Sequence, residues 1–308
     1  MNGFVYKSTG TWYQVRDENG DMINARIKGK FKIDNITSTN PLAVGDKVDF
    51  DKEENEDGFM IINNIYPRKN YITRQSPHNK HQHHIIASNL DQSLLFATLK
   101  DPKTSRGFID RFLVASEAYH VPAILVFNKV DVYRKRELER LEEFTLEYMR
   151  AGYKVLPMSI MENKGVDEVI NLLKNKTTLL SGHSGVGKSS FVNHIFPGIT
   201  LKTQDVSGWS GKGLHTTTFA EMYDLPGGGR IIDTPGLREF ALMDIEREEL
   251  SHYFHEMKEL INECRFNNCM HIEEPDCAVK HAVNEGKISE ERYISYRTIL
   301  DSIDGKKW

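Results

Sequence analysis

Eight consecutive residues in the second half of the chain have the types and spacing of a phosphate-binding loop. The segment 182–189 reads Gly-His-Ser-Gly-Val-Gly-Lys-Ser and matches G-x-x-x-x-G-K-[ST] in full. In this chemistry Lys188 bridges the β- and γ-phosphates, and the Ser189 hydroxyl binds Mg²⁺. The other predicted nucleotide contacts are Gly182, His183, Ser184, Gly185, Val186, Gly187 and Ser190. The alternative is a glycine-rich turn without a ligand, and the pattern alone does not choose between ATP and GTP.

A second motif, Asn128-Lys129-Val130-Asp131, selects the base. A carboxylate only accepts hydrogen bonds, and guanine offers two adjacent donors, its N1–H and its 2-amino group. Adenine has no such pair on that edge, so Asp131 should discriminate for guanine, with Asn128 and Lys129 in the same site. The tetrapeptide is a weak signal alone and a strong one beside a complete phosphate-binding loop.

The segment Asp233-Thr234-Pro235-Gly236 follows an apolar run and completes the phosphate site. We expect Asp233 to hold Mg²⁺ and the Gly236 N–H to lie near the γ-phosphate. The threonine run 216–218 offers a further hydroxyl to the metal, and Thr218 is the candidate. Its alternative is a solvent loop without function.

The residue that should orient the attacking water is missing from its usual place. Ras-like enzymes use a glutamine just after the D-x-x-G glycine, and here that position is Leu237, which offers no polar group. His215, beside the threonine run, is the candidate catalytic residue because an imidazole can accept or donate a proton near neutral pH. The alternative is a loop histidine without catalytic duty.

Four residues near the C-terminus have the types that zinc prefers: Cys264, Cys269, His271 and Cys277. They include all three cysteines of the chain. An odd, clustered set argues against disulfides. We expect one closed structural Zn²⁺ site per chain, against the alternative of reduced cysteines without a metal.

The elements that position these motifs follow from the apolar pattern. Over residues 71–244 apolar runs alternate with amphipathic segments, which predicts an α/β domain with a mostly parallel sheet covered by helices. The expected strands are Ser93–Leu99, Ala123–Phe127, Val155–Met158, Thr178–Leu180 and Arg230–Ile232, and the expected helices Phe108–His120, Lys135–Arg150 and Val166–Lys174. Ligands bind at the carboxyl ends of such strands, where the motifs lie.

The flanking regions read differently. Residues 1–70 show short strands and turn signals, which predict a small OB-fold-like β-barrel, and residues 245–308 predict a mostly helical module around the metal ligands. Within the barrel the cations Arg26, Lys28, Lys30 and Lys32 alternate along one strand. They form either an RNA-binding face or a solvated strand face. The histidine tract at 78–84 lacks spaced partner ligands and is expected to be an exposed loop.

Bulk properties fit a globular protein of several domains. The chain has 308 residues, 39% hydrophobic and 27% charged, with a net charge of −4. No apolar run is long enough for a membrane span, and the N-terminus lacks a signal-peptide pattern, so we expect a cytoplasmic location. Nothing in the sequence demands more than a monomer.

The order of the motifs is permuted, because the guanine motif precedes the phosphate-binding loop. In this order, and in the segment Gly213–Thr218 and the Cys/His set, nearly the whole chain resembles the ribosome small-subunit-dependent GTPase A (RsgA) family. The resemblance implies GTP hydrolysis to GDP and phosphate, stimulated by the small ribosomal subunit (ribosomal RNA and protein) during its late maturation. It also implies that Ser159 contacts guanine, although Ser159-Ile160 departs from the commoner Ser-Ala.

Two other functions are compatible with these motifs. One is a GTP-gated RNA-binding regulator with little turnover, which stimulation by a ribosomal subunit would distinguish from the leading hypothesis. The other is a metabolic P-loop enzyme such as a kinase, which the guanine motif disfavours.

Overall fold

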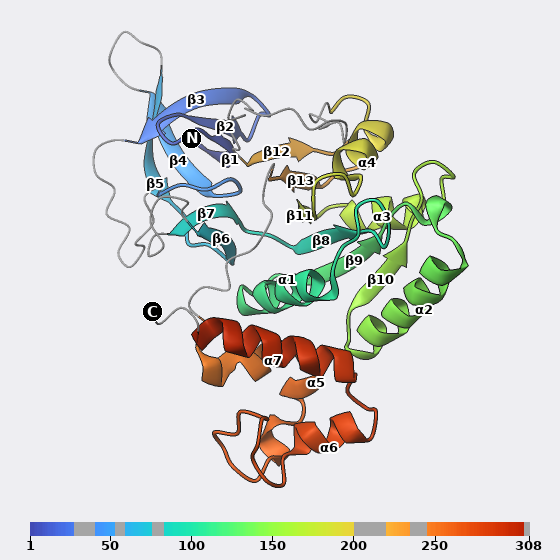
Figure 1. The fold of residues 1–308 in the computed structure, drawn as a ribbon. Helices are drawn as coiled ribbons and strands as arrows, with labels where there is room; N and C mark the ends of the chain where they lie inside the picture. Colours follow the sequence, from blue (N-terminus) through green and yellow to red (C-terminus); the bar gives the residue numbers. More distant parts are fainter. Residues whose placement is uncertain (28–40, 53–58, 76–82, 200–219, 235–244, 305–308) are drawn as a thin grey trace, which may run out of the picture.

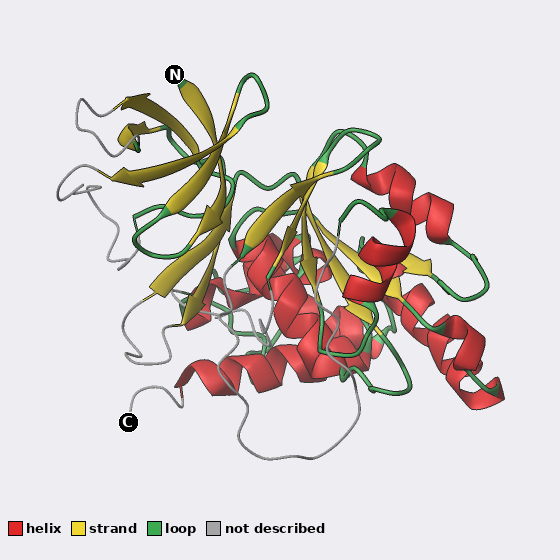
Figure 2. Cartoon of the chain, turned by 90° about the horizontal axis from the view of Figure 1, so that it is seen from above, coloured by secondary structure: helices red, strands yellow, loops and turns green. Residues whose placement is uncertain are grey.

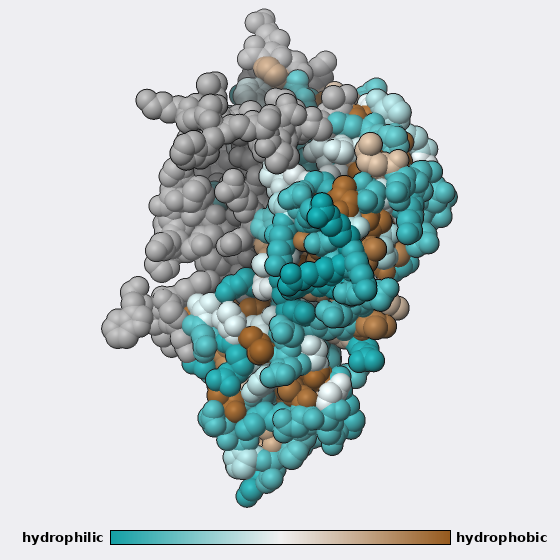
Figure 3. Space-filling view, turned by 45° about the vertical axis from the view of Figure 1, so that its right-hand side comes forward, coloured by the Kyte–Doolittle hydropathy of each residue, from teal (hydrophilic) through white to brown (hydrophobic). Residues whose placement is uncertain are grey.

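The computed structural model describes residues 1–27, 41–52, 59–75, 83–199, 220–234 and 245–304. They form an N-terminal barrel, a central sheet covered by helices, and a C-terminal group of helices (Figure 1). No helix in the described ranges has the length and apolarity needed to cross a membrane. On the face seen in Figure 3, the coloured apolar residues are scattered among hydrophilic ones.

The N-terminal strands close into the predicted barrel. Strand β1 pairs with β2 on one side and β4 on the other, and β3 and β5 complete the circuit β1-β2-β3-β5-β4. The bounds are β1 Asn2–Ser8, β2 Tyr13–Asp17, β3 Met22–Ile27, β4 Lys47–Lys52 and β5 Met60–Ile65. Residues spaced by two, such as Tyr13 and Val15 of β2 and Val48 and Phe50 of β4, fill the barrel interior because successive strand side chains point to opposite faces.

The central sheet is parallel at its core, as the alternating pattern predicted. Its order is β10-β9-β8-β11-β13, all parallel, followed by β12 antiparallel to β13. The bounds are β8 Gln92–Ala97, β9 Ala123–Phe127, β10 Lys154–Pro157, β11 Thr177–Ser181, β12 Glu221–Asp224 and β13 Arg230–Asp233. Strand β12 also pairs with β1 at Lys7↔Glu221, which joins barrel and central strands in one sheet.

Helices cover both faces of this sheet, because its strands are apolar on both. Leu95, Leu125 and Phe127 belong to one hydrophobic cluster with α1 and α2. Leu94, Ile124 and Val126 belong to another with α3 and α4. The helices are α1 Arg106–Ala118, η1 Val130–Val132, α2 Lys135–Arg150, α3 Val166–Leu173 and α4 Lys188–Ile195. The barrel lies to one side of them in Figure 2.

The C-terminal residues form the predicted helical module. Its elements are η2 Arg247–Tyr253, α5 His255–Lys258, η3 Ile261–Glu263, α6 Ala278–Asn284 and α7 Glu290–Asp304. Its apolar residues, including Leu250, Phe254 and Leu300, join the same hydrophobic cluster as α1 and α2. In Figure 1 α7 runs beside α1, with which it is in contact.

Three local features differ from the predictions. The strand expected to reach Leu99 ends at Ala97, because the Thr98 N–H bonds Thr104 Oγ1 at 3.0 Å and the Leu99 N–H bonds Tyr133 Oη at 2.8 Å. Strand β12 was not predicted. The histidine tract expected as a loop enters strand β7, His83–Ser88, which pairs with β6, Tyr71–Gln75.

Candidate nucleotide and metal sites

The predicted nucleotide residues lie at one edge of the central sheet. Asn128 follows β9, Ser159 follows β10, Gly182 follows β11, and Asp233 ends β13. Because these strands are parallel neighbours or next neighbours, their carboxyl ends meet at the edge where α/β sheets bind ligands.

The phosphate-binding loop has backbone conformations that its glycines permit. Gly182 has φ of +133°, and a Cβ there would lie 2.3 Å from the Phe96 carbonyl oxygen. Gly187 has φ of +98°, and its Cβ would lie 2.3 Å from Asn128 Nδ2. Side chains at these positions are excluded by strain and by contact. The loop ends at α4, whose N-terminus favours an anion.

Two opposite charges face each other beside this loop. Burial lowers the pKa of Lys188 and raises that of Asp233, and each opposes the shift of the other. Lys188 Nζ donates to the carbonyl oxygens of Gly182 at 2.6 Å and His183 at 3.0 Å. The cation predicted for phosphate and the carboxylate predicted for Mg²⁺ therefore lie within electrostatic reach of each other.

The guanine motif and Ser159 form a second group at the same edge. Ser159 Oγ donates to Asp131 Oδ1 at 2.6 Å, and the Glu162 N–H donates to Ser159 Oγ at 3.1 Å. Lys129 adopts the left-handed conformation, and its Nζ donates to the Asp101 carbonyl at 2.6 Å. The structure thus brings Ser159 and Asp131 into direct contact and orients the carboxylate.

Asn128 connects the two groups. Its Nδ2 donates to the Val186 carbonyl of the phosphate-binding loop at 2.9 Å, while Tyr133 Oη donates to the Asn128 carbonyl at 2.8 Å. Asn128 is buried, and its Oδ1 has no hydrogen-bond partner among the described residues. Such a buried acceptor calls for a bound donor, so this corner fits a polar ligand. The role of Tyr133 left no signal in the sequence, because a lone tyrosine after a motif has many uses.

Some predicted site residues belong to the described ranges and others do not. His215, Thr216, Thr217, Thr218 and Gly236 lie outside the described residues, as do Lys28, Lys30 and Lys32. Arg26 lies on β3 and is half-buried. Ser184 and Ser190 are exposed in or beside the phosphate-binding loop, and Ser189 is half-buried at the start of α4.

The predicted metal ligands form a compact cluster. One ligand atom from each of Cys264, Cys269, His271 and Cys277 lies within 4.8 Å of the others. Cys264 Sγ lies 3.9 Å from Cys277 Sγ and 3.6 Å from His271 Nδ1. Tetrahedral zinc with Zn–S bonds of about 2.3 Å places two sulfurs about 3.8 Å apart. The donor set and spacing therefore suit a metal such as zinc.

Two tyrosines of helix α7 donate hydrogen bonds to the backbone of the metal-binding cluster. Tyr293 Oη donates to the His271 carbonyl at 2.6 Å, and Tyr296 Oη donates to the Met270 carbonyl at 2.9 Å. Burial lowers the pKa of His271, which favours the neutral, metal-binding imidazole. Burial also raises the pKa of Cys277. The Cys277 thiol therefore favours the protonated form until a cation offsets the charge, so metal binding there releases a proton.

One contact to the phosphate-binding loop was missed by sequence reasoning. Phe108 on α1 packs against His183, with ring centroids 3.8 Å apart and 31° between the ring planes. Sequence spacing could not reveal it, because the two residues are distant in the chain and Phe108 looks like any apolar residue of an amphipathic helix.

Comparison with known families agrees with this arrangement. A model described as RsgA GTPase matches residues 65–243, and one described as RsgA N-terminal domain matches residues 2–60. The chain is 52% identical over 305 residues to the small ribosomal subunit biogenesis GTPase RsgA of Flavobacterium psychrophilum, covering 99% of this chain and 94% of that protein. It is 48% identical over 307 residues to the protein of that name from Bacteroides fragilis, covering 99% and 98%.

Solved structures are similar over the whole chain. YjeQ from Thermotoga maritima superposes with a TM-score of 0.80 at 34% identity, covering 99% of this chain and 98% of that one. YloQ, described as a circularly permuted GTPase, has a TM-score of 0.76 at 30% identity, covering 100% and 96%.

Proposed function

Because the chain belongs to the RsgA family of small ribosomal subunit biogenesis GTPases, we propose that it binds the small subunit and hydrolyses GTP in late subunit maturation, with the subunit stimulating turnover. The observation that best supports this proposal is the contact between the guanine motif and the phosphate-binding loop. Asn128 bonds Val186 at 2.9 Å, and Ser159 bonds Asp131 at 2.6 Å. A chain with permuted motifs thereby rebuilds one guanine-nucleotide site.

Within this site the residues take the following roles. Asp131 accepts from the guanine donors, and Ser159 orients the Asp131 carboxylate. Asn128 connects the motif to the phosphate-binding loop, and Lys129 connects it to the Asp101 carbonyl. The loop N–H groups and Lys188 bind the phosphates of GTP or GDP. Gly236 supplies a further N–H at the γ-phosphate.

Mg²⁺ fits the same edge of the sheet. Ser189, Asp233 and Thr218 would hold it. Among the described residues, Lys188 is the cation whose charge lowers the pKa of buried Asp233. When bound, the ion neutralises charge on the β- and γ-phosphates.

The attacking water needs a residue to orient it, since Leu237 replaces the usual glutamine. We assign that task to His215. A His215→Ala variant should keep its GDP affinity and lose most of the subunit-stimulated turnover, and a variant with full stimulated turnover would refute the assignment.

In this proposal the barrel and the C-terminal module bind the ribosome. We assign residues 1–70 to an RNA-binding barrel that uses Arg26, Lys28, Lys30 and Lys32, residues 71–244 to the GTPase domain, and residues 245–308 to a module that binds one structural Zn²⁺. The mostly buried cluster of three thiols and one imidazole supports zinc over harder cations. The protein acts as a cytoplasmic monomer in this proposal.

The test is GTP turnover by the pure protein alone, with small ribosomal subunits, and with large subunits as control. Strong stimulation by small subunits only is the expected result. Slow turnover that neither subunit changes would refute the proposal and favour a GTP-gated RNA-binding regulator.

A further inference from the structure

A buried arginine joins four helices where the C-terminal module meets the GTPase domain. Arg292 on α7 is 1% exposed, and Nη1 donates to Asp110 of α1 at 2.6 Å. Its Nε and Nη2 donate to Glu256 of α5 at 2.7 and 3.1 Å. Tyr148 of α2 donates to the same Asp110 oxygen at 2.9 Å. Since buried charges are tolerated only when paired, this network fixes the position of α7 on α1.

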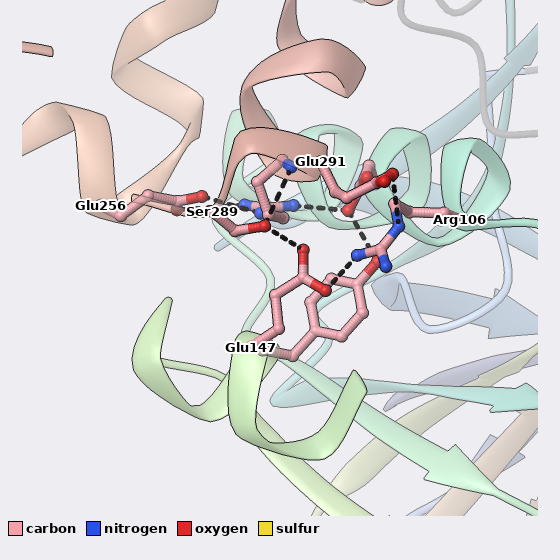
Figure 4. Close-up of polar contacts among 8 residues, drawn as sticks. Arg106, Glu147, Glu256, Ser289 and Glu291 are labelled. Atoms are coloured by element: carbon pink, nitrogen blue, oxygen red, sulfur yellow. Dashed lines mark hydrogen bonds and ion pairs between the residues drawn. The ribbon is translucent and has the colours of Figure 1, made fainter. Parts of the chain in front are cut away.

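A second set of contacts connects α1, α2 and the start of α7 (Figure 4). Arg106 of α1 forms an ion pair with Glu147 of α2 and approaches Glu291 of α7 at 3.4 Å. Ser289, just before α7, donates to Glu147 Oε1 at 2.7 Å. The first turn and a half of α1 is therefore held by the C-terminal module and by α2 together.

The opposite side of the same turn contacts the phosphate-binding loop. Arg106 and Asp110 are four residues apart and share a helix face, whereas Phe108 lies about 200° around the axis from Arg106. Phe108 is the residue that packs on His183 at 3.8 Å between ring centroids. The His183 carbonyl in turn accepts from Lys188 Nζ. Helix α1 thus lies between the module and the loop that carries the phosphate-binding lysine.

The module side of the contact continues to the metal cluster. Tyr293 follows Arg292 directly and donates to the His271 carbonyl at 2.6 Å. An unbroken series of contacts, through His271, α7, Asp110 and Phe108, therefore connects the cluster to the loop.

We infer that Asp110 and Arg292 are positioning residues for the nucleotide site. They fix the position of α1, and α1 contacts the phosphate-binding loop through Phe108 and His183. The affinity for the nucleotide phosphates therefore depends on how the C-terminal module packs on α1. By linkage, nucleotide binding stabilises the packing of the module on α1 to the same extent. The inference rests on guanine-nucleotide binding at this loop.

The chain offers a matched pair of variants for the test. Asp110→Asn and Glu256→Gln each remove one negative charge from the same arginine, but only Asp110 lies on the helix that carries Phe108. Affinity for fluorescent GDP is measured by titration, and stability by thermal unfolding. Asp110→Asn should weaken GDP binding about two- to thirty-fold, the usual range for a coupling residue. Glu256→Gln should lower stability and leave GDP affinity within about two-fold of wild type.

The Phe108 contact is tested separately. Phe108→Ala should weaken GDP binding in the same range, and Phe108→Tyr, which keeps the ring, should restore it. Equal GDP affinity in Asp110→Asn and wild type, or equal losses in the two charge variants, would overturn the inference and leave a purely structural ion pair.

Wild-type protein gives a readout even if Asp110→Asn fails to fold. Hydrogen exchange of the backbone amides in 289–304 is compared with and without GDP, in wild type and in Phe108→Ala. GDP should slow exchange in wild type and have a smaller effect in Phe108→Ala, whereas exchange unaffected by GDP in wild type would overturn the inference. Failure of wild type to bind GDP at all would instead refute the proposed function.

Discussion

Replacing Asp131 with asparagine should move the base preference from guanine toward xanthine. The wild-type carboxylate accepts from the N1–H and 2-amino donors of guanine. Ser159 Oγ holds Oδ1 at 2.6 Å, so the isosteric amide should keep the same place by accepting that bond through its oxygen. Its amino group then faces the 2-amino group of guanine, donor against donor, whereas xanthine presents a carbonyl at that position.

The magnitude follows from the hydrogen bonds lost. A bond to a charged group contributes about 1.5–3 kcal/mol, so two bonds give about 3–6 kcal/mol. GDP binding should weaken about 10²- to 10⁴-fold. Because the Ser159 contact survives, the free energy of unfolding should change by about 1 kcal/mol or less.

Competition of GDP and XDP for a fluorescent nucleotide measures both affinities in one assay. Asp167→Asn is the matched control, because it makes the same chemical change at an exposed position on α3. A variant at Asp131 that binds GDP as tightly as wild type would refute the assignment of this carboxylate to guanine.

Three other predictions follow from the described residues. Removing metal with a chelator should unfold the C-terminal module, seen as loss of helical circular dichroism, and a spectrum that does not change would contradict a structural metal. His255 Nε2 lies 2.8 Å from Glu117, whose hydrogen bond is the main reason that the pKa of His255 is raised above 6.5. The stability from this pair should be fully present below pH about 6.5 and be lost as pH rises through the higher folded-state pKa, and Glu117→Gln should remove that dependence in thermal unfolding across pH. Gly182→Ala should abolish nucleotide binding because its Cβ would lie 2.3 Å from the Phe96 carbonyl oxygen, so retained GDP binding would show that the loop can shift.

The sequence was sufficient to predict the parallel strands of the central sheet, for a physical reason. Ala123–Phe127 is apolar throughout because β9 is buried on both faces, and the boundaries predicted from that run agree with the structure. The guanine motif follows such a strand directly, so its place at the sheet edge was fixed by chain order alone.

The contacts between distant segments could not be predicted in the same way. Most arginines are solvated, but Arg292 is buried because two carboxylates from other helices form ion pairs with it. Strand β12 reads Glu-Met-Tyr-Asp and has little apolar pattern, and it is a strand because β13 and β1 flank it. Such contacts depend on a partner strand or side chain that is distant in the chain, and the local sequence does not identify it.

The barrel and the C-terminal module attach to different parts of the nucleotide site. Tyr6 Oη of β1 donates to Asp224 of β12 at 2.6 Å, and Lys7 pairs with Glu221 at 3.0 Å, so the barrel is bound to β12. In the chain, β12 follows the segment that holds His215, and its neighbour β13 ends at Asp233, where Mg²⁺ is expected to bind. The module instead contacts α1, on the side of the phosphate-binding loop. Because sheet strands are hydrogen-bonded to each other, the barrel is connected through β12 to β13 and Asp233. The two attachments therefore lie on different elements of the candidate site, the barrel beside Asp233 and the metal-binding module on α1, which packs on the phosphate-binding loop.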